Sequence, residues 1–523
     1  MTLTRAGSPG FSRRGLLRAG LSGAAALAAG PILAACAGPA GTGGTTGGAS
    51  APPKRGGTLR MAQPATTAEK MMPLILPAMQ LRGFQMFDPL VQFEAGEGNH
   101  GLAMMLAESI TMDSATQCTV VLKPGLTFHN GKPIGPDDIV ATMRRAGTEP
   151  GSSYSTAFTN VDFGATRALD ARTLRCVLQS PESTFAENFV AVPIMPADYD
   201  IAAPVGSGAY RLASYVPGER SVCVRFENYW NSELAYFDTV ETLTLADKST
   251  IVTALLGKQI DLASNIPANS IPVVEAQGFR KTQYATGNNY IINMNTQFAP
   301  LDRVEVRQAL RTLINRQEII AQVYGGLASP GTDVYTPLDA AYDTTRKPPA
   351  ADPARAMAVL RQAGLDKLPL TVSTTAGAAG IVDMAKAFTQ QAVAAGLPFK
   401  AQELDAATYY GAGYANRPLS TSFWPGESFT SMVKKTRLPN SPYNSTHWSN
   451  ERFNALYRNA MTEMDVAKRT EIFREMQDIE AAEGSMIVVL YPKLTDVAAP
   501  HIQGMAAQSM TQNVDVRTLW SSR

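Results

Sequence analysis

The stretch LKPGLTFHNGKPIGPDDIVATMRR, residues 122–145, predicts a strand, a sharp turn and a helix in immediate succession. Gly125 and Gly131 bracket the segment LTFHN, and glycine is favoured where the chain must turn sharply. Pro136 then stands at a first-turn position, two aspartates behind it favour the positive helix start, and two arginines favour the helix end. The stretch therefore predicts a β-to-α transition, and its residues are assigned to folding rather than to chemistry.

Short β-type runs and amphipathic helices extend in both directions from this stretch. Strands are expected at 56–62, 118–124, 173–179 and 221–227, and at 486–491, where irregular sequence follows. Helices are expected at 352–364, near 450–463, near 466–482, and as one long helix at 302–326. That long helix places on one face Val306, Leu310, Leu313, Ile314, Ile320 and Val323. Strands and helices without a strict βαβ rhythm predict an α/β protein with more than one lobe.

The composition of the chain limits the classes of partner that are expected. Lys and Arg number 46 against 45 Asp and Glu, and the first 35 residues hold four arginines and no acidic residue, so the remainder is slightly acidic. Without a basic run or stripe, nothing predicts a nucleic-acid partner. Cys118, Cys176 and Cys223 lie in alternating apolar stretches and are expected to be buried free thiols. A Cys118–Cys176 bridge between neighbouring strands stays open, since sequence does not give its geometry.

The first 35 residues predict an export signal. Arg13 and Arg14, followed by Leu16, resemble a twin-arginine export motif, and the Ala-, Gly- and Leu-rich run at 19–35 is short and weak for a membrane anchor. The sequence Leu-Ala-Ala-Cys ending at Cys36 resembles a lipobox, which implies cleavage before Cys36 and diacylation of its sulfur. Residues 36–55 have no periodicity and no large apolar residue, so they predict a flexible tether.

The 122–145 stretch also resembles the signature of extracytoplasmic solute-binding proteins of family 5, the peptide- and nickel-type receptors of ABC importers. Three further segments resemble the other hallmarks of that family in the same order: 204–230, 306–326 and 487–504. The resemblance runs from about Gly56 to the C-terminus. In physical terms, the Gly206-Ser207-Gly208 triplet permits close backbone packing or a positive φ.

The resemblance implies a two-lobed, type II periplasmic-binding-protein-like α/β fold. Lobe I would comprise 56–288 plus 492–523, with an inserted subdomain at about 84–200, and lobe II would comprise 289–491. The lobes would be joined by crossing strands at 288–296 and near 486–493 and would close around a ligand. The implied partners are a peptide or other polar solute, an ABC permease and ATPase, and the membrane through the lipid. We expect a monomer and no cofactor.

The expected ligand site departs from the family pattern. In peptide-binding relatives a loop of lobe II offers an Asp to the peptide ammonium, and an Arg can hold its carboxylate. The matching loop at 419–433 lacks the Asp-Pro, with Glu427 as its only carboxylate, and the segment 372–380 has no Arg. A short zwitterionic peptide is therefore put in doubt, and a longer peptide, a sugar conjugate or an opine stays open. The candidate contacts are Phe423, Trp424, Glu427, Asn288, Tyr290, Asn293, Thr66, Thr67 and Glu69.

Two other classes of function compete with the receptor. Ser431 and Lys434 form an S-x-x-K pattern of serine acyl-enzymes, but the companion Ser-Asp-Asn and K-T-G motifs are missing. A surface lipoprotein with a repurposed binding fold, acting in sensing, adhesion or chaperoning, is the third hypothesis. The four histidines are widely spaced and have no adjacent cysteine or carboxylate cluster, so no metal site is predicted.

Overall fold

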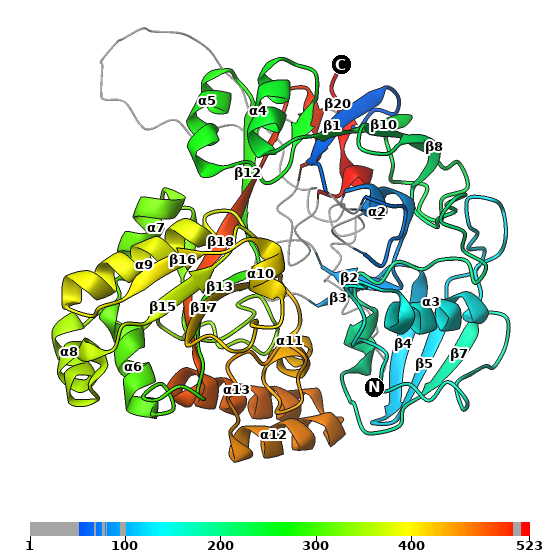
Figure 1. Cartoon of the computed structure of the whole chain (residues 1–523). Coiled ribbons are helices and arrows are strands. Elements are labelled where there is room, and N and C mark those ends of the chain that lie inside the picture. Colours follow the sequence, from blue (N-terminus) through cyan, green and yellow to red (C-terminus); the bar gives the residue numbers. More distant parts are fainter. Residues whose placement is uncertain (1–51, 67–68, 76–78, 80, 95–100, 506–513) are drawn as a thin grey trace, which may run out of the picture. The chain divides into compact units, whose positions relative to one another are not determined.

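The computed structural model describes residues 52–66, 69–75, 79, 81–94, 101–505 and 514–523 (Figure 1). The predicted signal, the predicted lipidation site Cys36, most of the predicted tether and Thr67 lie outside the described residues. Within them, no helix combines the length and the apolar character that crossing a membrane requires.

A 12-stranded mixed sheet organises residues 58–498, with its strands in the order β16-β15-β17-β13-β18-β11-β1-β10-β9-β8 and with β12 and β14 also paired to β18. One group of its strands is β1 (Thr58–Pro64), β8 (Tyr210–Val216), β9 (Arg220–Arg225), β10 (Thr239–Leu245), β11 (Leu262–Ala263) and β12 (Arg280–Ala285). The other group is β13 (Asn289–Met294), β14 (Ala328–Pro330), β15 (Thr371–Thr374), β16 (Lys400–Glu403) and β17 (Leu419–Trp424). The chain is therefore α/β, as predicted.

Strand β18 (Met486–Ala498) connects the two groups. Its first residues pair with β13, its middle with β14, and its residues 493–498 with β12 and β11. The prediction of irregular sequence after residue 491 was wrong, because Leu494, Val497 and Ala498 keep apolar side chains buried and extend the ladder.

Two large hydrophobic cores flank this strand. One is formed by buried side chains from residues 59–279 and 497–519, and the other by side chains from residues 290–490. The first core includes the smaller sheet of β4 (Ala107–Ser114), β5 (Gln117–Leu122), β6 (Arg167–Ala168) and β7 (Thr173–Val177). Cys118 and Cys176 lie opposite each other on β5 and β7, and both are buried free thiols, as is Cys223.

The 122–145 stretch folds as predicted. Strand β5 ends at Leu122, Gly125 and Gly131 both have positive φ, and helix α3 (Pro136–Thr148) begins with the proline. The Asp138 carboxylate accepts a hydrogen bond from the backbone N–H of Gly135 at 2.9 Å, which satisfies a donor at the helix start.

The helix predicted at 302–326 is broken into α6 (Val304–Leu313) and α7 (Arg316–Tyr324). Ile314 is extended, and the Asn315 side chain accepts a hydrogen bond from the N–H of Glu318, which starts a new helix. The apolar face was correct, since all its members except Val323 are buried. The other predicted helices are confirmed as α8 (Pro353–Gln362), α12 (Glu451–Thr462) and α13 (Val466–Glu483).

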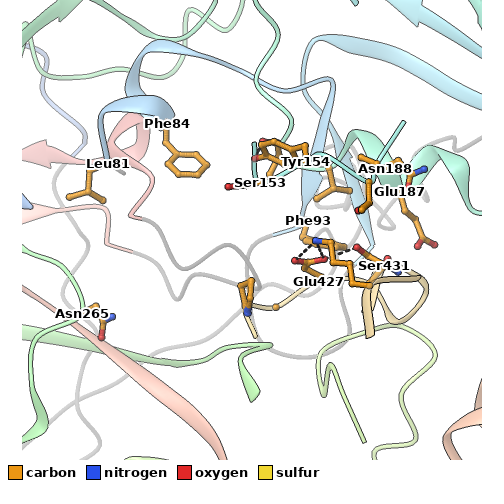
Figure 2. A pocket seen from close by; sticks show the side chains of 18 of the residues that line it. Leu81, Phe84, Phe93, Ser153, Tyr154, Glu187, Asn188, Asn265, Glu427 and Ser431 are labelled. Atoms are coloured by element: carbon orange, nitrogen blue, oxygen red, sulfur yellow. Dashed lines mark hydrogen bonds and ion pairs between the residues drawn. The ribbon is translucent and has the colours of Figure 1, made fainter. Parts of the chain in front are cut away.

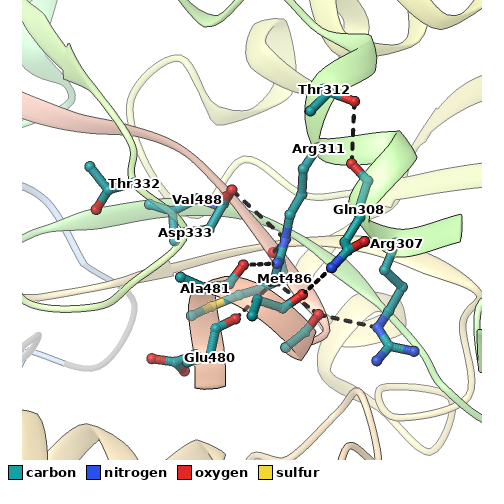
Figure 3. Close-up of polar contacts among 12 residues, drawn as sticks. Arg307, Gln308, Arg311, Thr312, Thr332, Asp333, Glu480, Ala481, Met486 and Val488 are labelled. Carbon is teal, nitrogen blue, oxygen red and sulfur yellow. Dashed lines mark hydrogen bonds and ion pairs between the residues drawn. The ribbon is translucent and has the colours of Figure 1, made fainter. Parts of the chain in front are cut away.

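Buried arginines fix α6 and α7 to the start of β18 (Figure 3). Arg311 donates to the backbone carbonyls of Met486 at 3.0 Å and Gly484 at 2.9 Å. Arg316 binds both carboxylate oxygens of Asp333 at 2.9 and 3.0 Å, and Asp333 also accepts from the N–H of Val488. A buried guanidinium needs several acceptors, and here the carbonyls at the end of α13 and the start of β18 supply them.

Candidate functional site

A pocket of about 670 Å³ lies between chain segments from residues 62–265 and chain segments from residues 377–435. One wall comes from the end of β1, helix α2 (Leu81–Met86), residues 153–157, the 3-10 helix η1 (Phe185–Phe189) and the residues after β11. The opposite wall comes from Gly377, the loop 425–428 after β17, and helix α11 (Phe429–Thr436). Its volume is that of a small-molecule or short-peptide site.

The position of the first wall follows from strand polarity. Strand β1 pairs in parallel with β10 on one side and with β11 on the other, so the carboxyl ends of all three strands meet at one edge. In open α/β sheets, ligands bind beyond the carboxyl ends of strands at such a reversal of strand order. Gln63, Ser264 and Asn265 stand at that edge and line the pocket.

Glu427 is the predicted site residue that lines the pocket. Its carboxylate accepts hydrogen bonds from Lys435 Nζ at 2.6 and 2.8 Å and from Ser431 Oγ at 2.6 Å. Figure 2 shows this cluster beside Glu187 and Asn188. The charge of Glu427 is thus compensated within α11 and the loop before it.

The other predicted residues near β17 lie behind the lining. Trp424 packs edge-on against Tyr443 with ring centroids 5.5 Å apart, and Phe423 packs against Tyr290 at 6.5 Å. Asn288 accepts a hydrogen bond from the N–H of Gly426, a lining residue, at 3.1 Å, so it holds the loop in place.

The remaining predicted contacts are buried in the scaffold or lie elsewhere. Asn293 donates to Ser422 Oγ at 3.1 Å. Glu69 pairs with Arg82 and accepts from the N–H of Gly218, and it lines a different surface depression. Thr66 is half-buried and does not line this pocket.

Gly377 is the residue through which the segment 372–380 contributes to the pocket. It lines the pocket, and a Cβ at this position would come within 2.7 Å of the Phe423 ring. A longer side chain cannot be accommodated there without displacing that ring. The segment therefore forms a close-packed part of the wall.

Sequence reasoning missed most of the lining, which includes Gln63, Phe84, Tyr154, Glu187, Lys248 and Asn265. The signal for Gln63 was its place directly after the strand predicted at 56–62, whereas no strand was predicted before Asn265. Glu187 accepts a hydrogen bond from Thr430 Oγ1 at 2.7 Å, and burial raises the pKa of its carboxyl to about 7. Lys248 donates to the carbonyl of Ser264 at 2.8 Å, and burial lowers the pKa of its ammonium group to about 8.

Among the described residues, four hydrogen bonds join residues 182–187 to helices α11 and α12, and we call them the cross-pocket contacts. Lys434 Nζ binds the Glu182 carboxylate at 2.6 Å, and Thr430 Oγ1 donates to Glu187. Ser183 Oγ donates to the carbonyl of Ala460 at 2.8 Å, and the Ser183 N–H donates to the carbonyl of Met461 at 2.9 Å. The lysine of the S-x-x-K pattern is thus paired with Glu182, while Ser431 donates to Glu427.

Among the described residues, no group of three or more His, Cys, Asp and Glu side chains is arranged to hold a metal ion.

Comparisons with known proteins agree on one family. The glutathione-binding protein GsiB of Escherichia coli K12 is 26% identical over 432 residues, which cover 77% of this chain and 83% of the relative. The structure superposes on the ABC transporter substrate-binding protein CtaP of Listeria monocytogenes with a TM-score of 0.78, at 22% identity, covering 90% of this chain and 100% of that one. It superposes on the periplasmic binding protein DppA of Helicobacter pylori, solved in complex with the peptide STSA, with a TM-score of 0.75, at 20% identity, covering 90% and 99%.

The fold is therefore that of the two-lobed periplasmic binding proteins. The family model described as bacterial extracellular solute-binding proteins, family 5 Middle, matches residues 101–436. Because this match spans more than half of the chain, the protein belongs to the family 5 bacterial extracellular solute-binding proteins.

Proposed function

We propose that this protein is the receptor subunit of an ABC importer. It captures a short peptide or another polar solute between two lobes and hands it unchanged to a membrane permease that an ATPase drives. The observation that carries this proposal is the pocket of about 670 Å³, whose walls come from residues 62–265 on one side and 377–435 on the other. The relatives named for binding glutathione or a peptide support a solute of that size.

The lobes in this proposal are residues 56–288 plus 492–523, and residues 289–491. Strands β13 and β18 would be the crossing strands about which they close. The pairing of β18 with both groups of strands supports that assignment. A ligand that touches both walls stabilises the closed form by the contacts that only this form provides.

In this proposal the ligand contacts the charged and apolar residues that line the pocket, among them Glu427. Phe423, Trp424, Tyr290, Asn288 and Asn293 would act by positioning the 425–428 loop.

The test begins with native mass spectrometry of the purified protein, followed by thermal-shift screening of peptides, opines and sugars. We expect a bound solute that raises the melting temperature and is recovered chemically unchanged. Phe84→Ala should reduce the shift, because Phe84 lines the pocket, whereas Phe298→Ala, which alters a half-buried ring in the other core, should not. Turnover of the solute, or the absence of any solute that stabilises the protein, would contradict the receptor function.

The protein would be anchored to the outer face of the cytoplasmic membrane through lipid on Cys36, with residues 37–55 as a tether. Two or three acyl chains, at about 0.8 kcal/mol per buried methylene, give stable anchoring. The expected result is incorporation of labelled palmitate that is lost in Cys36→Ala. Export through the twin-arginine route would further be blocked by replacing Arg13 and Arg14 with lysine, and secretion of that variant at the normal level would argue for another route.

A further inference from the structure

Two of the five charged side chains that line the pocket take part in none of the ion pairs formed by the described residues. Lys435 is paired with Glu427, and Lys434 is paired with Glu182. Among the described residues, neither Lys248 nor Glu187 has an oppositely charged group within 4.0 Å. Because a charge removed from water needs a partner, these two side chains identify the places where a ligand would supply one.

At the Lys248 end of the pocket, two strand ends lie side by side. Ala62 on β1 is paired with Ala263 on β11, so Gln63 and Ser264 follow as neighbours on strands about 4.8 Å apart. The ammonium group of Lys248 donates to the carbonyl of Ser264 at 2.8 Å, which uses one of its three N–H donors. The Asp496 carboxylate accepts from Ser264 Oγ, the N–H of Asn265 and Tyr284, and it attracts Lys248 without forming an ion pair with it.

Gln63 adds an unsatisfied amide to the same wall of the pocket. Its side chain is 1% exposed, and neither its oxygen nor its nitrogen has a hydrogen-bond partner among the described residues. An unpaired buried amide is destabilising, so the wall holds a donor and an acceptor that a bound polar group would satisfy.

The Glu187 end offers the opposite charge. Its carboxylate accepts hydrogen bonds from the Thr430 and Ser428 side chains. Burial and the nearby Asp339 raise its pKa, whereas these hydrogen bonds and Arg469, which is not in ion-pair contact, lower it. Figure 2 shows Glu187, Asn188 and Glu427 together on one side of the pocket and Asn265, the neighbour of Ser264, on the other. The two charges without an ion pair therefore lie toward separate ends.

Apolar side chains also line the pocket. They are Leu81, Phe84, Phe93 and Tyr154, and the Tyr154 hydroxyl already donates to the carbonyl of Ala191 at 2.6 Å. This apolar lining suits small apolar side chains or methylene groups rather than the many hydroxyls of a sugar.

From this arrangement we propose that the pocket selects an elongated zwitterion, a short peptide or amino-acid conjugate, whose carboxylate binds Lys248 and Gln63 and whose ammonium group binds Glu187. This inference rests on the proposed function and names its ligand class. It uses a pair of residues from the first core, in place of the Asp and Arg that the loop 419–433 and the segment 372–380 lack.

The test uses tri-, tetra- and pentaalanine, which span roughly 10 to 18 Å when extended. Each is measured by calorimetry with free ends, with an acetylated amine, with an amidated carboxyl group and with both ends blocked. We expect at least one length to bind, and each single block to weaken it about tenfold or more. In Lys248→Gln the dissociation constants of the free-acid and amidated peptides should differ by less than twofold. In Glu187→Gln the dissociation constants of the free-amine and acetylated peptides should differ by less than twofold.

Two exposed residues on β16 give matched controls, since Lys400→Gln and Glu403→Gln remove the same charges outside the pocket. Both control variants should retain the wild-type differences in affinity between free and blocked peptides. Gln63→Glu should weaken binding of the free-acid peptide more than binding of the amidated peptide, because the new carboxylate repels the peptide carboxylate. Equal binding of free and blocked peptides, unchanged differences in the variants, or no binding of any alanine peptide would overturn the zwitterion assignment. If other solutes still stabilise the protein in the thermal-shift screen, the receptor function stands without it.

The pH profile provides an independent readout. Below about pH 7 Glu187 becomes protonated and loses its attraction for an ammonium group, and above about pH 8 Lys248 loses its proton. Affinity for the free alanine peptide should therefore peak near pH 7–8, and the acidic limb should be absent in Glu187→Gln. An acidic limb that persists in that variant would contradict the role of Glu187.

Discussion

His129 links the stability of the first core to pH at the scale of a single residue. Its Nε2 lies 2.9 Å from the carbonyl of Gly208, and its Nδ1 accepts a hydrogen bond from the N–H of Gly206 at 3.2 Å. Burial lowers the pKa of the ring to about 4 from an ordinary value of 6.5. Between these values the unfolded state binds the proton more readily, so stability is lost as pH falls from 6.5 to 4.

We expect this loss to reach about 3 kcal/mol. Urea unfolding at pH 4, 5, 6 and 7 measures it, and His129→Gln should flatten the part of the profile that belongs to the imidazole. The exposed His447→Gln is the control and should leave the profile unchanged. Parallel profiles for wild type and His129→Gln would contradict the assignment.

Gly206 and Gly208 are required by close backbone packing. A Cβ at Gly206 would overlap the carbonyl oxygen of Met86, and one at Gly208 would lie 2.6 Å from the Met86 carbonyl carbon. Gly206→Ala should lower the free energy of unfolding by about 3 kcal/mol or more, because backbone must move to relieve the overlap. Gly147→Ala in α3 meets no atom within 4 Å and should be neutral or stabilising in the same urea titration.

At the scale of elements, α6 and α7 show what periodicity can and cannot predict. The apolar repeat over 302–326 predicted the buried face correctly, because both helices keep the same 3.6-residue period. It did not predict the break at Ile314, which depends on Asn315 capping and on Arg311 and Arg316 bonding to carbonyls and a carboxylate more than 15 residues away. Such distant acceptors leave no local pattern in the sequence.

Removing the cap should weaken α7. Asn315→Ala deletes the acceptor for the N–H of Glu318, so we expect the free energy of unfolding to fall by about 1 kcal/mol. The exposed Asn459→Ala within α12 replaces the same residue type without removing a cap and should change it by less than about 0.5 kcal/mol. Equal effects of the two substitutions would show that the break is not set by the cap.

The lining of the pocket was harder to predict than the strands and helices. Glu427 was found because one loop could be aligned by resemblance. Gln63, Glu187 and Lys248 come from segments far apart in the chain, and only the tertiary fold brings them to one pocket. Glu69 was predicted as a ligand contact, but its carboxylate pairs with Arg82 and does not line the pocket.

At the scale of the whole molecule, the cross-pocket contacts hold the walls together. The Lys434 side chain is 18% exposed and that of Glu182 is 4% exposed, so breaking this pair leaves a buried carboxylate with less compensation. In Lys434→Met we expect faster amide hydrogen exchange at 182–187, by about tenfold, because the Ser183 N–H bonds to the Met461 carbonyl across the pocket. Arg452→Met, which breaks an exposed pair with Glu475, should leave exchange there unchanged.

Because strand β18 runs unbroken through both groups of strands, we expect the two cores to unfold together on heating. A single ribbon of 13 residues carries backbone ladders for strands of both cores, so neither core can melt without fraying the edge of the other. Scanning calorimetry of the ligand-free protein should accordingly give one heat-absorption peak, with calorimetric and van't Hoff enthalpies in agreement. Two resolved peaks would mean that the two cores unfold independently although β18 connects them.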